Sequence, residues 1–579
     1  MNILLINPPR RIFFSRSPVA RWFPLGLACI ATGVKKAGYG VEVFDSIPYC
    51  EDNRLLTGEE GLEIGLSSRP GVSAAFHLGA SWERMGSYME KSSPNVIGIS
   101  AMMAAHRQEV LQTAKLARKI VPKAIIVVGG ADASNEPDSY LKTELIDYVI
   151  SGDGEESFPE LLEKLAKNEN VRNIKGICAA GDLFKSDDKI RYLGTGALDK
   201  LIPSYECFPM ERWYRVSNMR FAMISTSRGC FNKCTFCSQG NIPFRARSID
   251  SISKEIKQMI DKYDIDHLFF EDDMLLHNYK NSIELFEMIG NMKKRLYLHC
   301  LSGISSHLID KSLAHIMKQA GLHTVVLGFE TKQKSIRTKI NKNFSTISEL
   351  LRAIHLFKKE DVRDIRAFII AGLPDTRVED CLDDIGYILK QGARVNLNGY
   401  YPIGGTTLYE EVKQKEYIVS SHPSHFRSAY GNIDTQIFPR QHLLFLLDAY
   451  HGLKVLLEYT GFYECLHAFG ISGVELKDIT GTFLINVSQK IKKNVNSDNN
   501  SCCLHFANRL SIWFSIYSGD FYKGEELECG ASSNPGFCMF KIFPWVEIPY
   551  EFQYIIQKLR EYYFQYRRAN ERAMEFLGK

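Results

Sequence analysis

The sequence predicts an α/β protein with a doubly wound, Rossmann-like N-terminal domain, a partial TIM-like barrel of six β/α units and a mainly helical C-terminal domain. Two observations predict this class. Short apolar runs alternate with amphipathic stretches, first near the N-terminus and again in the middle of the chain. The 579 residues also exceed what one hydrophobic core holds. The expected divisions are a domain at 1–170, a linker at 171–214, a barrel at 215–415 and a substrate-shaping domain at 416–579.

The composition is that of a soluble globular protein. Hydrophobic residues make up 45% of the chain and charged residues 24%, with a net charge of +4. This balance favours neither a nucleic-acid partner nor a charged membrane surface. The N-terminus lacks the features of a signal peptide, and no apolar run is long enough to span a membrane. We therefore expect a cytoplasmic protein, in which clustered cysteines indicate metal or redox chemistry and not disulfides.

The N-terminal domain is predicted from five apolar runs separated by helical patterns at 24–38 and 106–120. Continuous apolar strands in this alternation indicate a parallel sheet, which binds ligands beyond the carboxyl ends of its strands. No G-x-G-x-x-G follows the first run, which disfavours a dinucleotide. The runs cover 2–7, 41–45, 96–100, 125–130 and 148–152. The candidate ligand-binding residues at their ends are Ser100, Gly129, Gly130, Gly152, Gly154 and Glu155.

The barrel is predicted from six further strand-like runs, each followed by a helical pattern. The active site of such a barrel lies at the carboxyl ends of its strands. The stretch SRGCFNKCTFCSQG (227–240) follows the first run and therefore falls at that end. The runs cover 221–226, 267–272, 296–301, 324–330, 365–372 and 395–401.

The stretch SRGCFNKCTFCSQG holds three cysteines, Cys230, Cys234 and Cys237, in the spacing C-x3-C-x2-C. The residues between the first two are largely polar, so these thiols are not simply small core residues. A structural zinc site usually has four ligands in C-x2-C pairs, and no second pair follows nearby. A four-iron cluster held by three thiolates leaves one iron for another molecule. Arg228 and Lys233 add positive charge that we expect to favour the thiolates.

This cysteine pattern, with an aromatic residue before the last cysteine, resembles the signature of the radical S-adenosylmethionine (AdoMet) superfamily. The resemblance implies that AdoMet binds the open iron of a 4Fe–4S cluster and is cleaved to a 5′-deoxyadenosyl radical. Matching positions imply that Phe236 packs near the adenine and that Glu271, Asp272 and Asp273 hold the methionine amino group. They also place Glu330 near the ribose or carboxylate, and Gly372 beneath the adenine.

The N-terminal domain resembles the cobalamin-binding domain of B12-dependent radical enzymes. The matching segments are INPP, FPLGLACIATGVKKAGYGVEVFD, LGASWERMGSYMEKSSPNVIGIS, VVGGADASNEPD and YVISGDGEESF. The D-x-H-x-x-G motif that supplies a histidine ligand to cobalt in many cobalamin proteins is missing, and we expect His77 and His106 to be ordinary histidines. The resemblance therefore implies a cobalt without a histidine on its lower face, and it does not identify the residue there.

A cobalamin domain before a radical AdoMet barrel resembles the class B radical AdoMet methyltransferases and the related anaerobic cyclase of chlorophyll synthesis. The resemblance implies methyl transfer from methylcobalamin to an unactivated carbon of a small molecule, such as a natural product or a lipid. It also implies an electron donor such as flavodoxin or ferredoxin. Two alternatives stay open: radical cyclisation, ring rearrangement or oxygen insertion on the same scaffold, and a non-enzymatic cobalamin or redox sensor.

The C-terminal region is predicted to contain a helix over 441–461 and another over 550–577. We expect the last helix to pack its aromatic side chains against the rest of the protein. The cysteines of this region, from Cys465 to Cys538, lack the paired spacing of metal ligands. The chemistry of this region is not predicted.

Overall fold

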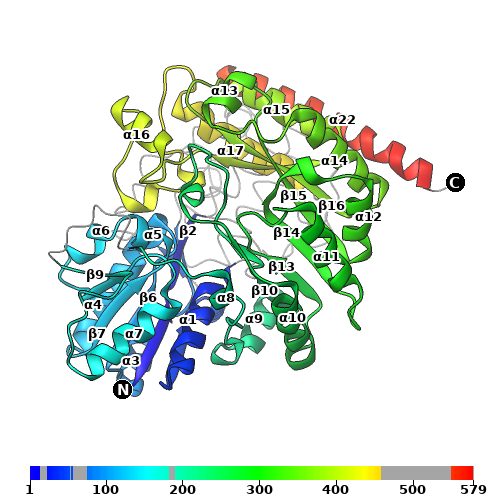
Figure 1. The fold of residues 1–579 in the computed structure, drawn as a ribbon. Coiled ribbons are helices and arrows are strands. Elements are labelled where there is room, and N and C mark those ends of the chain that lie inside the picture. Colours follow the sequence, from blue (N-terminus) through cyan, green and yellow to red (C-terminus); the bar gives the residue numbers. More distant parts are fainter. Residues whose placement is uncertain (14–21, 53, 57–74, 181–189, 458–549, 578–579) are drawn as a thin grey trace, which may run out of the picture.

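The computed structural model describes residues 1–13, 22–52, 54–56, 75–180, 190–457 and 550–577 (Figure 1). Two six-stranded sheets form the framework, one in the N-terminal part and one in the middle of the chain. In Figure 1 they face each other across the centre of the molecule, with the N-terminal sheet at the lower left.

The N-terminal sheet has the strand order β3-β1-β6-β7-β8-β9. The first five of these strands are parallel and confirm the five predicted runs, whereas β9 is antiparallel and was not predicted. β9 lies in the segment predicted as a linker, outside the strand–helix alternation on which the prediction rests. The bounds are β1 (Ile3–Asn7), β3 (Val41–Asp45), β6 (Val96–Ser100), β7 (Ile125–Gly129), β8 (Tyr148–Ile150) and β9 (Ile177–Ala179).

Helices cover both faces of this sheet, as expected for a doubly wound fold. Helix α1 contacts α7 on one face and α3 contacts α4 on the other. A small antiparallel sheet in the order β2-β5-β4 was not predicted. The helices are α1 (Leu25–Lys36), α3 (Trp82–Ser92), α4 (Arg107–Ile120), α5 (Ala131–Asn135), α6 (Asp138–Leu141) and α7 (Gly154–Ala166). The added strands are β2 (Arg10–Phe13), β4 (Arg54–Leu56) and β5 (Ala75–Leu78).

The middle of the chain forms the predicted partial barrel. Its six strands lie in chain order and are all parallel, because each pair is joined by a crossover that contains a helix. The strands are β10 (Phe221–Ile224), β13 (His267–Phe270), β14 (Tyr297–Ile304), β15 (Leu322–Glu330), β16 (Asp364–Ala371) and β17 (Arg394–Gly399). The main helices are α10 (Ile249–Tyr263), α11 (Tyr279–Gly290), α12 (Lys311–Gln319), α14 (Ile347–Lys359) and α15 (Val378–Lys390).

The segment predicted as a linker is folded where the structure describes it. It contains β9, α8 (Thr195–Leu198) and α9 (Met210–Ser217). The Trp213 side chain is fully buried and donates a hydrogen bond to Asp45 at 2.8 Å. The Tyr205 hydroxyl donates to the carbonyl of Met223 on β10. One hydrophobic core therefore runs from the N-terminal sheet through this segment into the barrel.

The described C-terminal elements lie along one side of the barrel. Helices α17 (Arg440–Leu457) and α22 (Tyr550–Leu577) contact each other and α15. Phe552, Ile556 and Tyr562 of α22 are buried, which confirms that this helix packs its aromatic residues internally. The predicted end of the first helix at Gly461 and the cysteines from Cys465 to Cys538 lie outside the described residues. No described helix is long and apolar enough to cross a membrane.

Candidate active site

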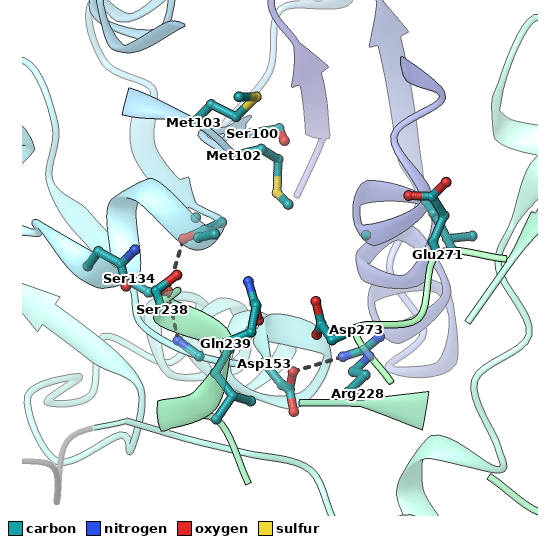
Figure 2. A pocket seen from close by; sticks show the side chains of 18 of the residues that line it. Ser100, Met102, Met103, Ser134, Asp153, Arg228, Ser238, Gln239, Glu271 and Asp273 are labelled. Carbon is teal, nitrogen blue, oxygen red and sulfur yellow. Dashed lines mark hydrogen bonds and ion pairs between the residues drawn. The ribbon is translucent and has the colours of Figure 1, made fainter. Parts of the chain in front are cut away.

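A cavity of about 2210 Å³ lies between the carboxyl ends of the two sheets. Its walls include the loops that follow β6, β7 and β8 on one side, and the loops after β10 and β13 with the end of β15 on the other. Figure 2 shows Ser100 and Met102 on one wall and Gln239, Glu271 and Asp273 on the facing side. Both predicted ligand sites therefore open into the same space.

The N-terminal wall contains every residue that the strand ends predicted. Gly130 has a φ of +124°, and a Cβ there would lie 2.5 Å from the carbonyl oxygen of Ala101, so only glycine fits this turn. Gly154 packs against Ile30 of α1, where a Cβ would lie 2.8 Å from Cδ1. The cavity-lining residues are Ser100, Gly129, Gly130, Gly152, Gly154 and Glu155.

Ion pairs join the two walls at the base of the cavity. The Arg228 guanidinium, two residues before Cys230, contacts Asp153 at 2.9 Å and Glu155 at 2.6 Å. Arg245 of β12 (Arg245–Ala246), the partner of β11 (Ser227–Arg228), also contacts Asp153. Figure 2 shows the Arg228–Asp153 pair. Arg228 and Glu155 therefore join the two domains, a structural contact that the sequence did not predict.

The three cysteines lie on the loop after β10, as expected. Cys237 lines the cavity, while Cys230 and Cys234 are partly buried in the same loop. Burial raises the pKa of all three thiols, that of Cys234 to about 12. The backbone N–H of Asn232 donates to the Cys230 sulfur at 3.4 Å, which favours a thiolate there.

The donor set of this loop fits an iron–sulfur cluster. Among the described residues, no three His, Cys, Asp or Glu side chains are arranged to hold a single metal ion. A cubane cluster has a different requirement, because each of its thiolates binds a separate iron atom and the ligands stand farther apart. Three thiols in one loop, one of them facing a cavity wide enough for a ligand of the fourth iron, meet that requirement.

The positive charge near the thiols comes from an unpredicted residue. Lys342 opposes the rise in pKa of all three cysteines. The Lys233 amine instead donates to the carbonyl of Gly240, and Arg228 binds the carboxylates of the N-terminal domain. The expectation that Lys233 and Arg228 favour the thiolates is therefore not supported by their contacts. Lys342 belongs to no recognisable motif, so only the fold reveals it.

The three acidic residues after β13 lie in two different environments. Glu271 and Asp273 line the cavity. Desolvation raises the pKa of Asp273 to about 6, although a backbone hydrogen bond from Gly229 acts in the opposite direction. Asp272 is only 3% exposed and does not line the cavity; it accepts hydrogen bonds from the Thr226 and Ser227 hydroxyls. The structure thus places Asp272 beneath the cysteine loop and away from the predicted ligand.

Glu330 ends β15 with one carboxylate oxygen available. Its φ of +67° is unusual for a residue with a side chain. Oε1 accepts from Lys342 Nζ at 2.9 Å, whereas the buried Oε2 has no hydrogen-bond partner in the structure. Glu330 is one of the cavity-lining residues, and its unpaired Oε2 is buried beside the cavity. Such an atom is costly to leave unpaired and suits a hydroxyl or amine of a ligand.

The two remaining predicted residues differ in position. Phe236, between the last two cysteines, lines the cavity and also packs against a small core that contains Leu373 and Tyr400. Gly372 follows β16 with a φ of +76°, but it does not line the cavity. A Cβ at Gly372 would lie 2.9 Å from Leu443 of α17. Gly372 thus permits a turn and the approach of α17.

In a comparison with known proteins, two protein-family models match this chain. A model of the B12 binding domain matches residues 15–162, and a model of the radical SAM superfamily matches residues 224–388. These ranges contain the loops of the two facing walls.

Among curated relatives, an uncharacterized methyltransferase of Pyrococcus horikoshii is 28% identical over 71% of this chain and 83% of its own length. A cytidylyl-2-hydroxyethylphosphonate methyltransferase of Streptomyces wedmorensis is 25% identical over 64% of this chain and 73% of its own. The fold is similar to that of the radical AdoMet methyltransferase TsrM from Kitasatospora setae, with a TM-score of 0.56 and 15% identity over 74% of this chain and 82% of that one.

The matched domains, the cysteine loop and the shared cavity agree on one set of cofactors, namely a 4Fe–4S cluster, AdoMet and cobalamin. The two relatives described above are named methyltransferases and align with this chain over 83% and 73% of their own lengths. The chain therefore has a B12-binding domain followed by a radical AdoMet domain, the arrangement of the cobalamin-dependent radical AdoMet enzymes.

Proposed function

We propose that this enzyme methylates a small molecule bound in the cavity between its two sheets. The observation that carries the proposal is that one cavity is lined both by the strand ends of the B12-binding domain and by the cysteine loop of the radical AdoMet domain. When bound, the cluster and AdoMet supply a 5′-deoxyadenosyl radical, and methylcobalamin supplies the methyl group. A substrate between the two walls is within reach of both.

We assign the cofactor contacts as follows. Cys230, Cys234 and Cys237 would hold three irons of the cluster. The carboxylates of Glu271 and Asp273 suit the ammonium group of AdoMet, because they line the cavity beside the cysteine loop and charge-assisted hydrogen bonds are strong. Glu330 Oε2 suits a ribose hydroxyl, and Phe236 suits the adenine.

The B12-binding wall is assigned on its shape. Gly129, Gly130 and Gly152 line this wall without side chains, and the Ser100 hydroxyl adds a polar group on the same edge. Gly154 and Glu155 act indirectly in this proposal, since Gly154 packs on α1 and Glu155 holds Arg228.

The protein's own contribution is to position both cofactor sites and to exclude water. The ion pairs of Arg228 and Arg245 join the walls at the base of the cavity. They set the distance between the two sites, on which transfer to a bound substrate depends. Enclosure also protects a radical from solvent. We propose a natural product or lipid as substrate, flavodoxin or ferredoxin as electron donor, and the cytoplasm as the location.

The proposal is tested by anaerobic turnover of the reconstituted enzyme with methyl-labelled AdoMet. Cytidylyl-2-hydroxyethylphosphonate and tryptophan serve as first probes, because similar proteins act on or bind them. Label in a product, with both 5′-deoxyadenosine and S-adenosylhomocysteine, is the expected result. A product formed with 5′-deoxyadenosine but without S-adenosylhomocysteine contradicts methylation and favours ring rearrangement or oxygen insertion.

The cluster assignment has a separate test. Cys234→Ala should lose most of the cluster iron and all AdoMet cleavage, because two thiolates hold a cubane poorly. Cys207→Ala, at a partly buried cysteine outside the loop, is the matched control and should keep both. A Cys234→Ala protein with a full cluster and normal cleavage would refute the assignment.

A further inference from the structure

The topology of the N-terminal sheet identifies where a ligand must lie above it. In the order β3-β1-β6-β7-β8, the chain leaves β1 for β3 on one side and returns to β6 on the other. The loops after β1 and β6 therefore diverge, and doubly wound proteins bind ligands at this point. The second of these loops contains Ala101, Met102 and Met103.

Both methionines are exposed to an unusual degree. Met102 is 54% and Met103 42% exposed, and both line the cavity. Large apolar side chains gathered in a cavity wall indicate a surface that a ligand covers. In Figure 2, Met102 extends from the end of β6 into the cavity, towards the side that carries Gln239 and Asp273, while Met103 turns away from it.

The Met102 sulfur is positioned by the neighbouring glycine turn. A Cβ at Gly130 would lie 3.1 Å from Met102 Sδ, so the thioether rests over Gly130. Gly130 also allows the backbone of Ala101 to approach. The next strand, β7, therefore supports the side chain that projects at the centre of this wall.

Histidine is the usual protein nitrogen ligand of cobalt, and the N-terminal domain has two histidines, His77 and His106. Among the described residues that line the cavity, His106 is the only histidine, and its Nδ1 is enclosed by protein without a hydrogen-bond partner. His77 is buried, and its Nε2 contacts the carbonyl of Ala80 at 2.8 Å. The Nε2 of His77 is therefore engaged, and His106 is the described histidine that the experiment below must exclude.

We propose that Met102 is the residue that lies beneath the lower face of the bound corrin, the position at which the sequence implies no histidine. The barrel wall faces the upper side, which carries the methyl group. A flat apolar macrocycle covers the exposed thioether, which is at most a weak, soft donor. Because cobalt loses axial ligands as it is reduced, a lower face without a nitrogen ligand favours the reduced metal. The inference concerns only how cobalamin is held and does not depend on the reaction or its substrate.

The test is electron paramagnetic resonance of the holoenzyme with bound cob(II)alamin, without substrate. A nitrogen ligand splits each cobalt line into three, whereas a thioether or an empty position does not. The wild-type enzyme and Met102→Leu should show unsplit lines. Met102→His should show the threefold splitting and a more negative cob(II)alamin/cob(I)alamin midpoint potential. Met103→His is the matched control and should keep unsplit lines.

Two outcomes would overturn the inference. Threefold splitting in the wild-type enzyme would show a nitrogen ligand, and its loss in His106→Gln would identify that histidine as the source. Unsplit lines in Met102→His at full cobalamin occupancy would place the lower face elsewhere. Cobalamin content and circular dichroism of each variant show that it is folded and loaded. Failure here leaves the methyl-transfer test untouched, because the spectra are recorded without turnover.

Discussion

Lys342 is the residue through which the cysteine loop and Glu330 influence each other. Its amine contacts Glu330 Oε1, and its charge lowers the pKa of each cysteine against the effect of burial. A cluster carrying three thiolates is an accumulation of negative charge. The Lys342 ammonium group stabilises that charge and at the same time fixes one oxygen of Glu330.

We therefore expect Lys342→Met to retain its cluster poorly. Outer contacts of metal ligands typically change metal affinity by about 10- to 100-fold, so loss of iron to a chelator should be faster by about 10-fold or more. Iron and sulfide analysis over time measures this. Lys332→Met removes a lysine paired with the exposed Asp383 and should behave as wild type. Equal iron retention in all three proteins would contradict the role of Lys342.

Asp273 makes AdoMet binding depend on pH. Its pKa of about 6 means that the carboxylate forms as the pH rises through that value. Only the carboxylate attracts the AdoMet ammonium group, so affinity should increase from pH 5 to pH 7. In Asp273→Asn this increase should vanish, and affinity at pH 7 should fall by about 10-fold or more, as for a lost charged hydrogen bond. Titration calorimetry at several pH values tests both points, with Asp250→Asn as an exposed control.

The same raised pKa affects stability with the opposite sign. Between its ordinary value of 3.8 and about 6, the folded protein holds a proton on Asp273 that the unfolded chain has released. This contribution favours folding at low pH and is lost as the pH rises through about 6. Asp273→Asn should therefore lose less stability than wild type between pH 4 and pH 6 in denaturant unfolding of the protein without AdoMet. Parallel stability curves would show that Asp273 has an ordinary pKa.

The role of a residue was predictable where the spacing between residues is typical of one kind of site. It was not predictable where the role depends on the direction in which the side chain points. The C-x3-C-x2-C spacing indicated the three thiols. The run Glu271–Asp273 indicated carboxylates at the cavity, but Asp272 instead accepts hydrogen bonds from Thr226 and Ser227. Neighbouring side chains in an extended segment point in opposite directions, and the turn after β13 decides which of them face the cavity.

At the scale of elements, the C-terminal helix depends on one glycine of α15. A Cβ at Gly386 would overlap the ring of Tyr562 on α22, which is buried there. This contact explains why a helix distant in sequence lies along the barrel (Figure 1).

Gly386→Ala should weaken the docking of α22. Forcing a methyl group into a filled interface typically costs about 1–3 kcal/mol, which exceeds what better helix propensity returns. Faster hydrogen exchange within 550–577 and a lower melting temperature are the expected results. Gly196→Ala is the matched control, because that helical glycine has open space beside it. Unchanged exchange in Gly386→Ala would show that the tyrosine adapts without cost.

Elements with a clear period were predicted and those without one were missed. The five parallel strands of the N-terminal sheet and the six of the barrel match apolar runs, because strands buried on both faces are continuously apolar. β2, β4 and β5 include Arg10, Arg54 and His77, so they are not continuous apolar runs, and β9 lies in the segment predicted as a linker. The segment predicted as a linker is folded because Tyr205 and Trp213 enter the core of the neighbouring domains.

For the whole molecule, Arg228 connects the two domains at the point where their sites meet. Its guanidinium holds Asp153 and Glu155 of the B12-binding domain, and its backbone leads directly into the cysteine loop. Both carboxylates are largely buried, so their charges need this partner.

Arg228→Met should destabilise the protein by about 3 kcal/mol, since removing one partner leaves buried charges unpaired. Thermal and urea unfolding measure this, and faster proteolysis between the domains should accompany it. Arg212→Met removes an exposed ion pair with Glu51 and should cost less than about 1 kcal/mol. Equal stability of the two variants would show that the Arg228 contacts do not hold the domains together.

By itself, the sequence determined the two α/β domains, the cysteine loop and the family of cofactors, because these depend on local periods and fixed spacings. Tertiary structure alone decided that both sites share one cavity, that Lys342 supplies the cation, and that Arg228 binds Asp153 and Glu155. These contacts join residues from 12 to 75 positions apart. No local pattern records such contacts. Lys342 meets Glu330 within the folded barrel, and Arg228 meets Asp153 and Glu155 only because the carboxyl ends of two separate sheets are packed face to face.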